Sequence, residues 1–385
     1  MAPDRLTLLI NGRRYEGWQA VRVSHGIDRC VSDFHLEVSE RWTGQETPWQ
    51  ILPYAVCQIL IDDEVILTGY VEDYDPRIGP AEHSTQITGK SKTMDLLECT
   101  PDIPSGQFRG YPLAAIARSI AALFGIDVVV EAPDAETWTF DNAQFERCET
   151  AFTFLERLGR MAGVLLSDDA QGRLVLTTAG GTRAAGSLVE GQNIQRGSAK
   201  LTSKGRFSEY IVKGQHGVAK SGGQTWGGAG GVGGPSSPAA GAKVQTSMRV
   251  VAYDTDVPRY RPRVVLAESQ LTLAGMQMRA NWLRQAAFGH SVSADITVAG
   301  WRQADGSLWQ RNQIIAVTSP TLGVDQDLLI ARVEFALAAG TGRTTTLHVA
   351  PVQAYTPDPG QVKLHKHKGK GHGGNCPNWQ GAGGQ

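Results

Sequence analysis

The sequence predicts a mixed α+β protein that is mainly β, with two β-domains flanking a small α+β unit. Short runs of alternating apolar residues fill the first hundred positions and return after about residue 185. Between them, apolar residues recur every three to four positions, which is the period of an amphipathic helix. At 385 residues the chain also exceeds one ordinary hydrophobic core, so we expect at least two domains.

Strand and turn signals predict the N-terminal β-domain. Leu6, Leu8 and Ile10 alternate with other residues up to Asn11-Gly12, a dipeptide favoured in type I′ hairpin turns because both central positions need positive φ. Several short strands separated by turn signals are typical of a small barrel or sandwich. The further strands are expected around 21–23, 34–38, 57–61 and 65–71.

Helical periodicity marks the middle segment. Gly110-Tyr111-Pro112 begins a helix whose apolar face runs over 113–124 and which Gly125 ends. Thr150 caps a second helix that ends at Gly163. A strand at 128–130 and a hairpin with strands at 164–167 and 173–177 complete the predicted α+β unit.

The β-pattern then returns in the C-terminal half. The Gly-rich segment 214–242 buries too little apolar surface to offset an ordering entropy of about 1–2 kcal/mol per residue, so it predicts a flexible insertion. Strands are expected at 210–213, 250–253, 291–298, 313–317, 328–337 and 344–349, with a helix over 274–287. The predicted domains are 1–105, 106–185 and 186–352, followed by a flexible His/Lys/Gly-rich tail over 353–385.

Charge and cysteine content argue against several classes of protein. Lysine plus arginine (37) nearly balance aspartate plus glutamate (38), which removes the basic field typical of proteins that bind nucleic acids or anionic membranes. The five cysteines are widely spaced and lack a C-x-x-C pair, so neither a disulfide scaffold nor structural zinc is indicated. No apolar run approaches the roughly 18 residues of a membrane span, so we expect no membrane insertion.

Motifs for catalysis are also weak. Gly89-Lys90-Ser91 resembles the end of a phosphate-binding loop, but Ser84 stands where that motif needs its first glycine. Asp168-Asp169 predicts a solvated hairpin turn rather than a catalytic pair, because catalytic carboxylates face each other across a substrate. Neither a G-x-S-x-G nor an H-E-x-x-H motif occurs. We therefore expect neither an enzyme nor a cofactor. A catalytic site whose residues converge from distant positions in the sequence stays open as an alternative.

The C-terminal tail holds the one candidate transition-metal site. His365, His367, His372 and Cys376 offer nitrogen and sulfur ligands at short spacing. The lysines between them oppose a cation, so we expect no metal there and instead a basic tail that docks on an acidic partner or stays free.

Three stretches resemble the baseplate hub proteins of Mu-like contractile-tail phages. They are Arg206-Phe207-Ser208-Glu209-Tyr210-Ile211-Val212-Lys213-Gly214, the segment from Asp254-Thr255-Asp256-Val257 to Ala267-Glu268-Ser269, and Gly300-Trp301-Arg302 followed by Gly306-Ser307-Leu308-Trp309 and Asn312. The similarity covers roughly residues 5 to 352 and departs in the Gly-rich insertion and the tail.

The resemblance implies a structural role in assembly. In that family the hub looks like a homotrimer whose chains each supply two related tube-like β-barrels, so that three chains present six barrels to a sixfold tube. It implies a tail tube protein, a trimeric central spike protein and other baseplate proteins as partners, with only transient passage of DNA. The expected location is the virion tail baseplate, assembled in the host cytoplasm.

Two further expectations concern single side chains. Arg259, Tyr260, Arg261 and Arg263 lie either at a subunit interface or on an intrachain strand edge. Trp301 and Trp309 are expected to anchor the second β-domain, with both indole N–H groups hydrogen-bonded.

Two alternative functions stay open. One is the hub of a phage-derived bacteriocin or of a secretion or injection machine. The other is a peptidoglycan-binding or cell-wall-degrading tail protein, because small α+β units also occur in peptidoglycan binders.

Overall fold

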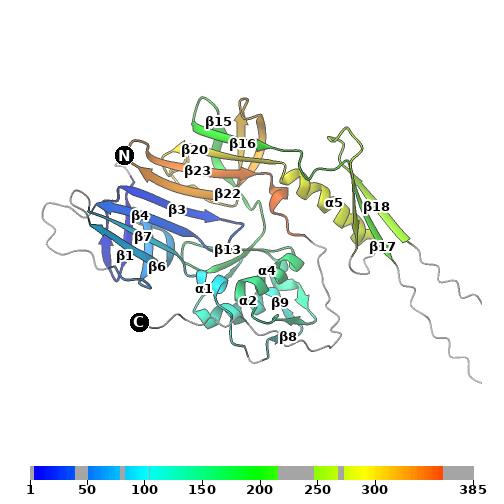
Figure 1. The fold of residues 1–385 in the computed structure, drawn as a ribbon, viewed down its shortest axis with the longest axis horizontal. Helices are drawn as coiled ribbons and strands as arrows, with labels where there is room; N and C mark the ends of the chain where they lie inside the picture. The colour runs from blue at the N-terminus through cyan, green and yellow to red at the C-terminus, as the bar shows by residue number, and fades with distance from the viewer. Residues whose placement is uncertain are drawn as a thin grey trace, which may run out of the picture. The chain divides into compact units, whose positions relative to one another are not determined.

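The computed structural model describes residues 4–39, 51–78, 83–103, 105–215, 247–267 and 273–358 (Figure 1). Within them the chain is mainly β, which confirms the predicted fold class. The chain divides into two compact units, of which the smaller is centred on Arg206–Arg284 and the larger holds the described residues on either side of it. Most of the predicted insertion at 214–242 and of the tail at 353–385 lies outside the described residues.

The first β-module opens with the predicted hairpin. β1 (Leu6–Ile10) pairs antiparallel with β2 (Arg13–Tyr15), and the turn residues Asn11 and Gly12 have φ values of 49° and 77°. The module has the strand order β3-β4-β7-β6-β5-β1-β2. Its other strands are β3 (Ala20–Gly26), β4 (Asp33–Ser39), β5 (Val56–Ile61), β6 (Glu64–Ile78) and β7 (His83–Ser91).

The second β-module lies in the same larger unit. β15 (Thr182–Val189) and β16 (Ile194–Leu201) escaped the sequence prediction, because the polar residues along β16 leave little apolar alternation to detect. The other strands match the predicted segments and are β20 (Val292–Ala299), β21 (Gln313–Ser319), β22 (Val324–Ala338) and β23 (Gly342–Ala350). A short helix, η2 (Val352–Tyr355), follows.

The two modules repeat one strand order. In the first module the order is β3-β4-β7-β6-β5, and in the second it is β16-β20-β23-β22-β21, with antiparallel neighbours throughout. The long strands β6 and β22 each have 15 residues, and their hairpin partners β7 and β23 each have nine. Each long strand also shifts register once against its hairpin partner, between Val71 and Asp73 and between Ile330 and Arg332. The repetition ends at the next strand, since β1 is antiparallel to β5 whereas β15 is parallel to β21.

One backbone pairing joins the modules into a single sheet. β22 runs antiparallel to β3 from Arg332↔Gly26 to Leu337↔Val21, and Figure 1 shows the two strands side by side. Their inward side chains belong to one continuous apolar core, in which Val23, Trp301 and Phe335 are buried. The N-terminal and C-terminal β-segments therefore form one folding unit.

The α+β unit lies between the modules in sequence and has a core of its own. Its two predicted helices are confirmed as α2 (Leu113–Ala121), extended by the 3-10 turn η1 (Ala122–Phe124), and α4 (Ala151–Ala162). Thr150 caps α4 by accepting from Thr153 N, and Gly125 and Gly163 end the two helical segments with positive φ. The remaining elements are α1 (Met94–Glu98), α3 (Asp134–Thr137), β8 (Gln107–Phe108), β9 (Tyr111–Pro112), β10 (Val128–Val130), β11 (Thr139–Phe140), β12 (Ala143–Gln144), β13 (Leu165–Asp168) and β14 (Leu174–Thr177).

The smaller unit is built on a three-stranded sheet of order β18-β17-β19. Its strands are β17 (Glu209–Gln215), β18 (Ser247–Tyr253) and β19 (Pro262–Leu266), and α5 (Leu273–Gly289) begins within it. A Cβ added at Gly214 would lie 3.0 Å from Met276 Sδ, so α5 packs closely on one face of this sheet. None of the described helices is long and apolar enough to cross a membrane.

Two expectations about single residues need correction. Trp301 is fully buried and donates from Nε1 to Ala336 O at 3.0 Å, as expected, but the buried Nε1 of Trp309 meets no acceptor among the described residues. The apolar ring of Trp309 joins the core, and that packing fixes its orientation. Cys30, Cys57 and Cys99 are free thiols, whereas Cys148 is disulfide-bonded, which the scattered cysteines did not suggest.

Gly89 serves packing rather than phosphate binding. It lies within β7, and a Cβ at this position would come within 2.2 Å of Tyr70 O and 2.5 Å of the Phe34 ring. Only a residue without a side chain allows β6, β7 and the Phe34 ring to approach so closely.

We expect Gly89→Ala to lower the free energy of unfolding by about 1–3 kcal/mol, because the added methyl group overpacks the sheet. Gly181→Ala is the matched control, since the only atom near its Cβ lies 3.9 Å away. Urea denaturation of the full chain measures both, and equal midpoints for the two variants would contradict the packing role.

Candidate functional site: a buried charged junction and an exposed arginine edge

A buried carboxylate lies where the first β-module meets the α+β unit. Asp168 ends β13 with its side chain fully buried, and it accepts hydrogen bonds from Ser32 N and Ser32 Oγ, both at 2.9 Å. Ser91 Oγ accepts from the same Ser32 N at 3.1 Å. The expectation of a solvated Asp168 is wrong, because the β3–β4 turn folds over the hairpin tip. Asp169 does form the turn, accepting from Gln171 N and Arg173 N.

Two further titratable groups surround Asp168. Arg311 Nη1 lies 3.7 Å from Asp168 Oδ1, and His25 Nδ1 lies 3.1 Å from Ser32 Oγ. Burial raises the pKa of Asp168, while Arg311 and the hydrogen bonds from Ser91 and Ser32 oppose the rise. Burial and Arg311 lower the pKa of His25 to about 3, so its imidazole is neutral near neutral pH.

Serine, histidine and aspartate thus converge from distant positions, but in the wrong order for nucleophilic catalysis. In a catalytic triad the histidine lies between the serine and the aspartate. Here Ser32 lies between His25 and Asp168, and its side chain is buried. The geometry ties the β3–β4 turn to β13 and offers no activated nucleophile at this place.

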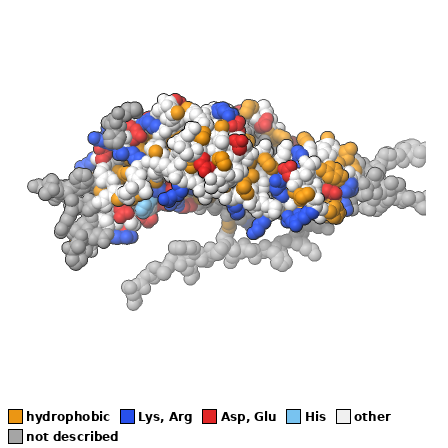
Figure 2. Space-filling model, turned by 90° about the horizontal axis from the view of Figure 1, so that it is seen from above, with side chains coloured by type: hydrophobic (Ala, Val, Ile, Leu, Met, Phe, Trp, Pro, Cys, Tyr) orange, Lys and Arg blue, Asp and Glu red, His pale blue; other side chains and the backbone are white. Residues whose placement is uncertain are grey.

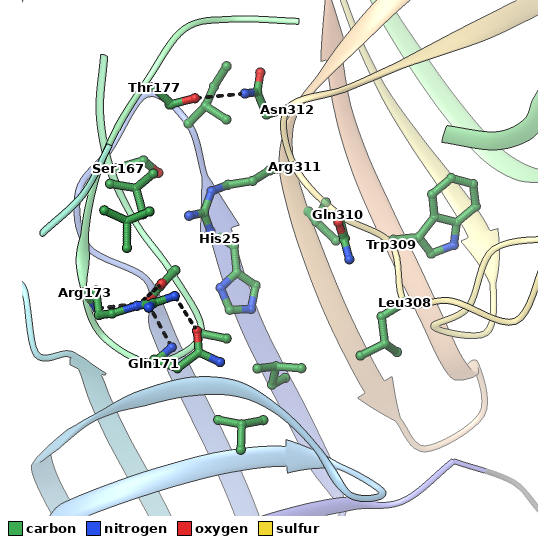
Figure 3. A pocket seen from close by; sticks show the side chains of 18 of the residues that line it. His25, Ser167, Gln171, Arg173, Thr177, Leu308, Trp309, Gln310, Arg311 and Asn312 are labelled. Atoms are coloured by element: carbon green, nitrogen blue, oxygen red, sulfur yellow. Dashed lines mark hydrogen bonds and ion pairs between the residues drawn. The ribbon is translucent and has the colours of Figure 1, made fainter. Parts of the chain in front are cut away.

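A pocket of about 420 Å³ opens beside this junction (Figure 3). Figure 3 shows His25 and Arg311 at its wall, with Asn312 hydrogen-bonded to Thr177 and Arg173 held to Gln171. Both β-modules and the α+β unit contribute to its lining. The described residues hold no group of three or more side chains suited to a metal, and the candidate ligands His365, His367, His372 and Cys376 lie outside them.

Arg302 clamps the second module to the first. Its Nε lies 2.8 Å from Asp4 Oδ1, its Nη2 3.1 Å from Asp62 Oδ2 and its Nη1 2.6 Å from Glu64 Oε1. The positive φ of 73° at Gly300 and the burial of Trp301 set the turn from which Arg302 projects. One motif of the family resemblance therefore acts as an ionic clamp between the modules.

The other two stretches of the family resemblance, 206–214 and 254–269, contact each other in the smaller unit. Arg206 contacts Asp254 through Nε at 3.0 Å and Nη2 at 2.8 Å, and Asp256 through Nη2 at 2.8 Å. Ser208 N donates to Arg261 O, and Ser208 Oγ accepts from Arg261 N. These contacts fasten the segment before β19 to the start of β17.

The predicted interface residues lie on an exposed edge of this unit. Arg261 and Arg263 stack over the Phe207 ring at 5.0 and 5.7 Å, and Arg263 belongs to the edge strand β19. Arg259 is exposed, and Tyr260 keeps 80% of its surface exposed. Over the smaller unit, Figure 2 shows hydrophobic side chains in orange beside basic ones in blue. The edge also exposes Val264 and Leu266.

Comparisons with known proteins identify the family. Models for the N-terminal domain of the Mu phage baseplate assembly protein GpP-like, the second domain of the baseplate hub protein gp44-like and the fourth domain of GpP match residues 5–91, 93–178 and 272–358. The baseplate hub protein gp44 of Escherichia phage Mu is 28% identical over 373 residues, which are 96% of this chain and 94% of that protein. The chain belongs to the family of Mu-like phage baseplate hub proteins.

Solved structures agree with this membership. The 43 kDa tail protein of prophage MuSo2 from Shewanella oneidensis is 29% identical, with a TM-score of 0.77 over 92% of this hub and 99% of that chain. The tail protein from Neisseria meningitidis MC58, at 18% identity, shares the fold with a TM-score of 0.72 over 93% and 99% of the two chains. The hub is thus a structural protein of the phage tail baseplate.

Removal of the buried carboxylate should destabilise the hub. We expect Asp168→Ala to lower the free energy of unfolding by about 3 kcal/mol, because it removes two buried hydrogen bonds from Ser32 and the carboxylate beside Arg311. Asp63→Ala is the control, since its side chain is 96% exposed, and its effect should stay within about 0.5 kcal/mol. Similar denaturation midpoints for the two variants would show that the junction contributes little.

The pH dependence of stability should also report on Asp168. Because burial raises its pKa, the folded hub holds this proton more tightly than the unfolded chain does. The resulting stabilisation is complete below the ordinary aspartate pKa of about 4 and is lost as the pH rises through the raised value. Asparagine does not titrate, so the stability of the wild type relative to Asp168→Asn should fall as the pH rises above about 4. A relative stability that rises with pH would contradict the raised pKa.

Proposed function

We propose that the hub assembles as a homotrimeric ring that joins the hexameric tail tube to the trimeric central spike. The ring continues the channel through which DNA passes, and it assembles in the host cytoplasm. Its role is mechanical, since it holds tube, spike and other baseplate proteins in register and catalyses no reaction.

The repeated strand order of the two β-modules carries this proposal. Each chain holds β3-β4-β7-β6-β5 and β16-β20-β23-β22-β21 side by side in one sheet. Three copies therefore supply six similar modules, which is the number that a sixfold tube requires, while the threefold symmetry of the ring suits a threefold spike. We further propose that each module forms a tube-like barrel, and that the predicted domains at 1–105, 106–185 and 186–352 reflect this plan.

The charge balance supports passage of DNA without retention. Each phosphate that a basic surface neutralises strengthens binding, so a strongly basic channel would retard transit. The net charge of −1 gives the chain no overall attraction for DNA. We therefore propose a neutral to acidic channel wall and only transient contact with DNA.

The arginine edge of the smaller unit is the proposed contact with neighbouring subunits. Arginine and tyrosine are enriched in interface cores, and among these four residues Arg259, Tyr260 and Arg263 are exposed while Arg261 is half-buried.

The purified hub should form trimers at micromolar concentration. Sedimentation equilibrium measures the mass without a column matrix, and electron microscopy of the same sample should show rings with a central opening. A stable monomer, or a particle with a filled centre, would contradict the ring.

The arginine edge has its own test. Arg261→Glu with Arg263→Glu should weaken trimer formation if the edge lies between subunits, because it reverses two charges there. The control is Arg118→Glu, on the exposed surface of α2. Equal dissociation of both variants would place the arginine edge away from the interface.

A further inference from the structure

One strand of the α+β unit has an open edge. β10 lies at the end of the sheet order β10-β14-β13, and among the described strands it pairs only with β14. Asp127 O accepts from Leu174 N on β14, and Glu131 N donates back to that strand, so alternate residues of this stretch direct their backbone groups toward β14. The N–H and C=O groups of Val128 and Val130 point the other way and bond to no described residue.

Hollows beside β10 leave room for another strand. A cavity of about 640 Å³ is lined by Val128 and Val129 together with Arg118 of α2 and Gly125. The 420 Å³ pocket of Figure 3 also reaches Val129, and Arg173 borders both hollows. An open strand edge in such a place can accept an extended segment through hydrogen bonds between the two backbones.

The surroundings of this edge are acidic. Residues 93–178 hold thirteen aspartates and glutamates against six lysines and arginines. Asp127 and Glu131 flank β10, both are exposed, and neither forms an ion pair with a described residue. Arg118 and Arg173 beside them are already engaged in ion pairs with other carboxylates. The open edge therefore favours a basic segment.

The C-terminal tail of the same chain has the matching composition. Residues 359–385 lie outside the described residues, and they contain four lysines and no aspartate or glutamate. Within 361–366 the apolar Val362 and Leu364 alternate with polar residues, which is the pattern of a strand with one apolar face.

The described chain also ends close to this sheet. Val352 and Tyr355 of η2 pack in one apolar cluster with Leu165 of β13. β10 lies two strands away from β13, which is about 10 Å at the usual spacing of strands. Six extended residues after Tyr355 span about 20 Å. The segment 361–366 can therefore reach β10 of its own chain.

We propose that residues 361–366 add a fourth strand to the sheet by pairing with the open edge of β10 in the same chain. The backbone groups of Val128 and Val130 then gain partners, which offsets part of the entropy lost when the tail is ordered. The tail covers an edge that would otherwise be open to other chains. This pairing does not depend on the proposed ring.

The side chains follow from the alternation of the tail. Val362 and Leu364 stand opposite the two valines of the edge and extend their apolar face. Lys363, between them, then lies between the carboxylates of Asp127 and Glu131, whether the added strand runs parallel or antiparallel to β10.

Hydrogen–deuterium exchange of the hub tests the pairing. A peptide that spans 126–132 should exchange the amides of Val128 and Val130 about tenfold more slowly in the full chain than in a hub that ends at residue 358, because truncation removes their acceptors. Equal exchange rates in the two proteins would overturn the proposal.

Proline variants identify the segment of the tail that pairs. Leu364→Pro should remove the protection as truncation does, because proline has no N–H to donate. Gly369→Pro is the matched control, since it places proline in the same tail beyond the paired segment, and it should keep the protection. The assignment to 361–366 is wrong if the two variants exchange alike.

Chemical cross-linking separates pairing within a chain from pairing between copies. A carbodiimide joins a lysine to a carboxylate in direct contact, so it should link Lys363 to Asp127 or Glu131, and the linked peptides should come from the monomer band of a denaturing gel. Links found only in dimer or trimer bands would show that the edge binds the tail of a second copy, and links only to other carboxylates would overturn the pairing. Either failure leaves the mass of the assembled hub, and so the proposed ring, unaffected.

Discussion

The backbone pairing of β3 with β22 is the constraint on which the rest of the hub depends. Residues near the start of the chain and residues more than 300 positions later share one ladder of hydrogen bonds. Closing so long a loop costs entropy, which the continuous core under both modules has to offset. As a result the two modules cannot move independently of each other. This rigidity suits a structural protein of a phage tail baseplate.

Ion pairs and hydrogen bonds fix how the parts of the larger unit are oriented, because such contacts are directional and apolar packing is not. Arg302 reaches three carboxylates of the first module, and Asp168 receives two hydrogen bonds from Ser32. Burying such groups gives little net stability, but a misplaced partner is costly, so they favour one arrangement over near alternatives. The junction of Ser32, His25 and Asp168 therefore has a structural role, because it holds the β3–β4 turn against β13.

The smaller unit differs from the rest in charge as well as in position along the chain. Residues 206–284 hold ten lysines and arginines against four aspartates and glutamates, whereas the remaining residues hold twenty-seven against thirty-four. The segment is inserted between β16 and β20. The equivalent strands of the first module, β3 and β4, are joined by a turn alone. An insertion at a hairpin leaves the module intact, so a basic, partly apolar surface is added without disturbing the sheet.

The sequence by itself determined the local elements and the family. Asn11-Gly12, Gly125 and Gly163 mark turns and helix ends because positive φ is a property of single residues, and alternation marks strands with one buried face. It did not reveal β16, most of whose residues are exposed, or the burial of Asp168, whose partners come from more than 100 residues away. The repeated strand order and the pairing of β3 with β22 emerged only in the tertiary structure. Which strands pair depends on how distant segments bury their apolar faces and in which register they meet. The local pattern of residues determines neither the burial nor the register.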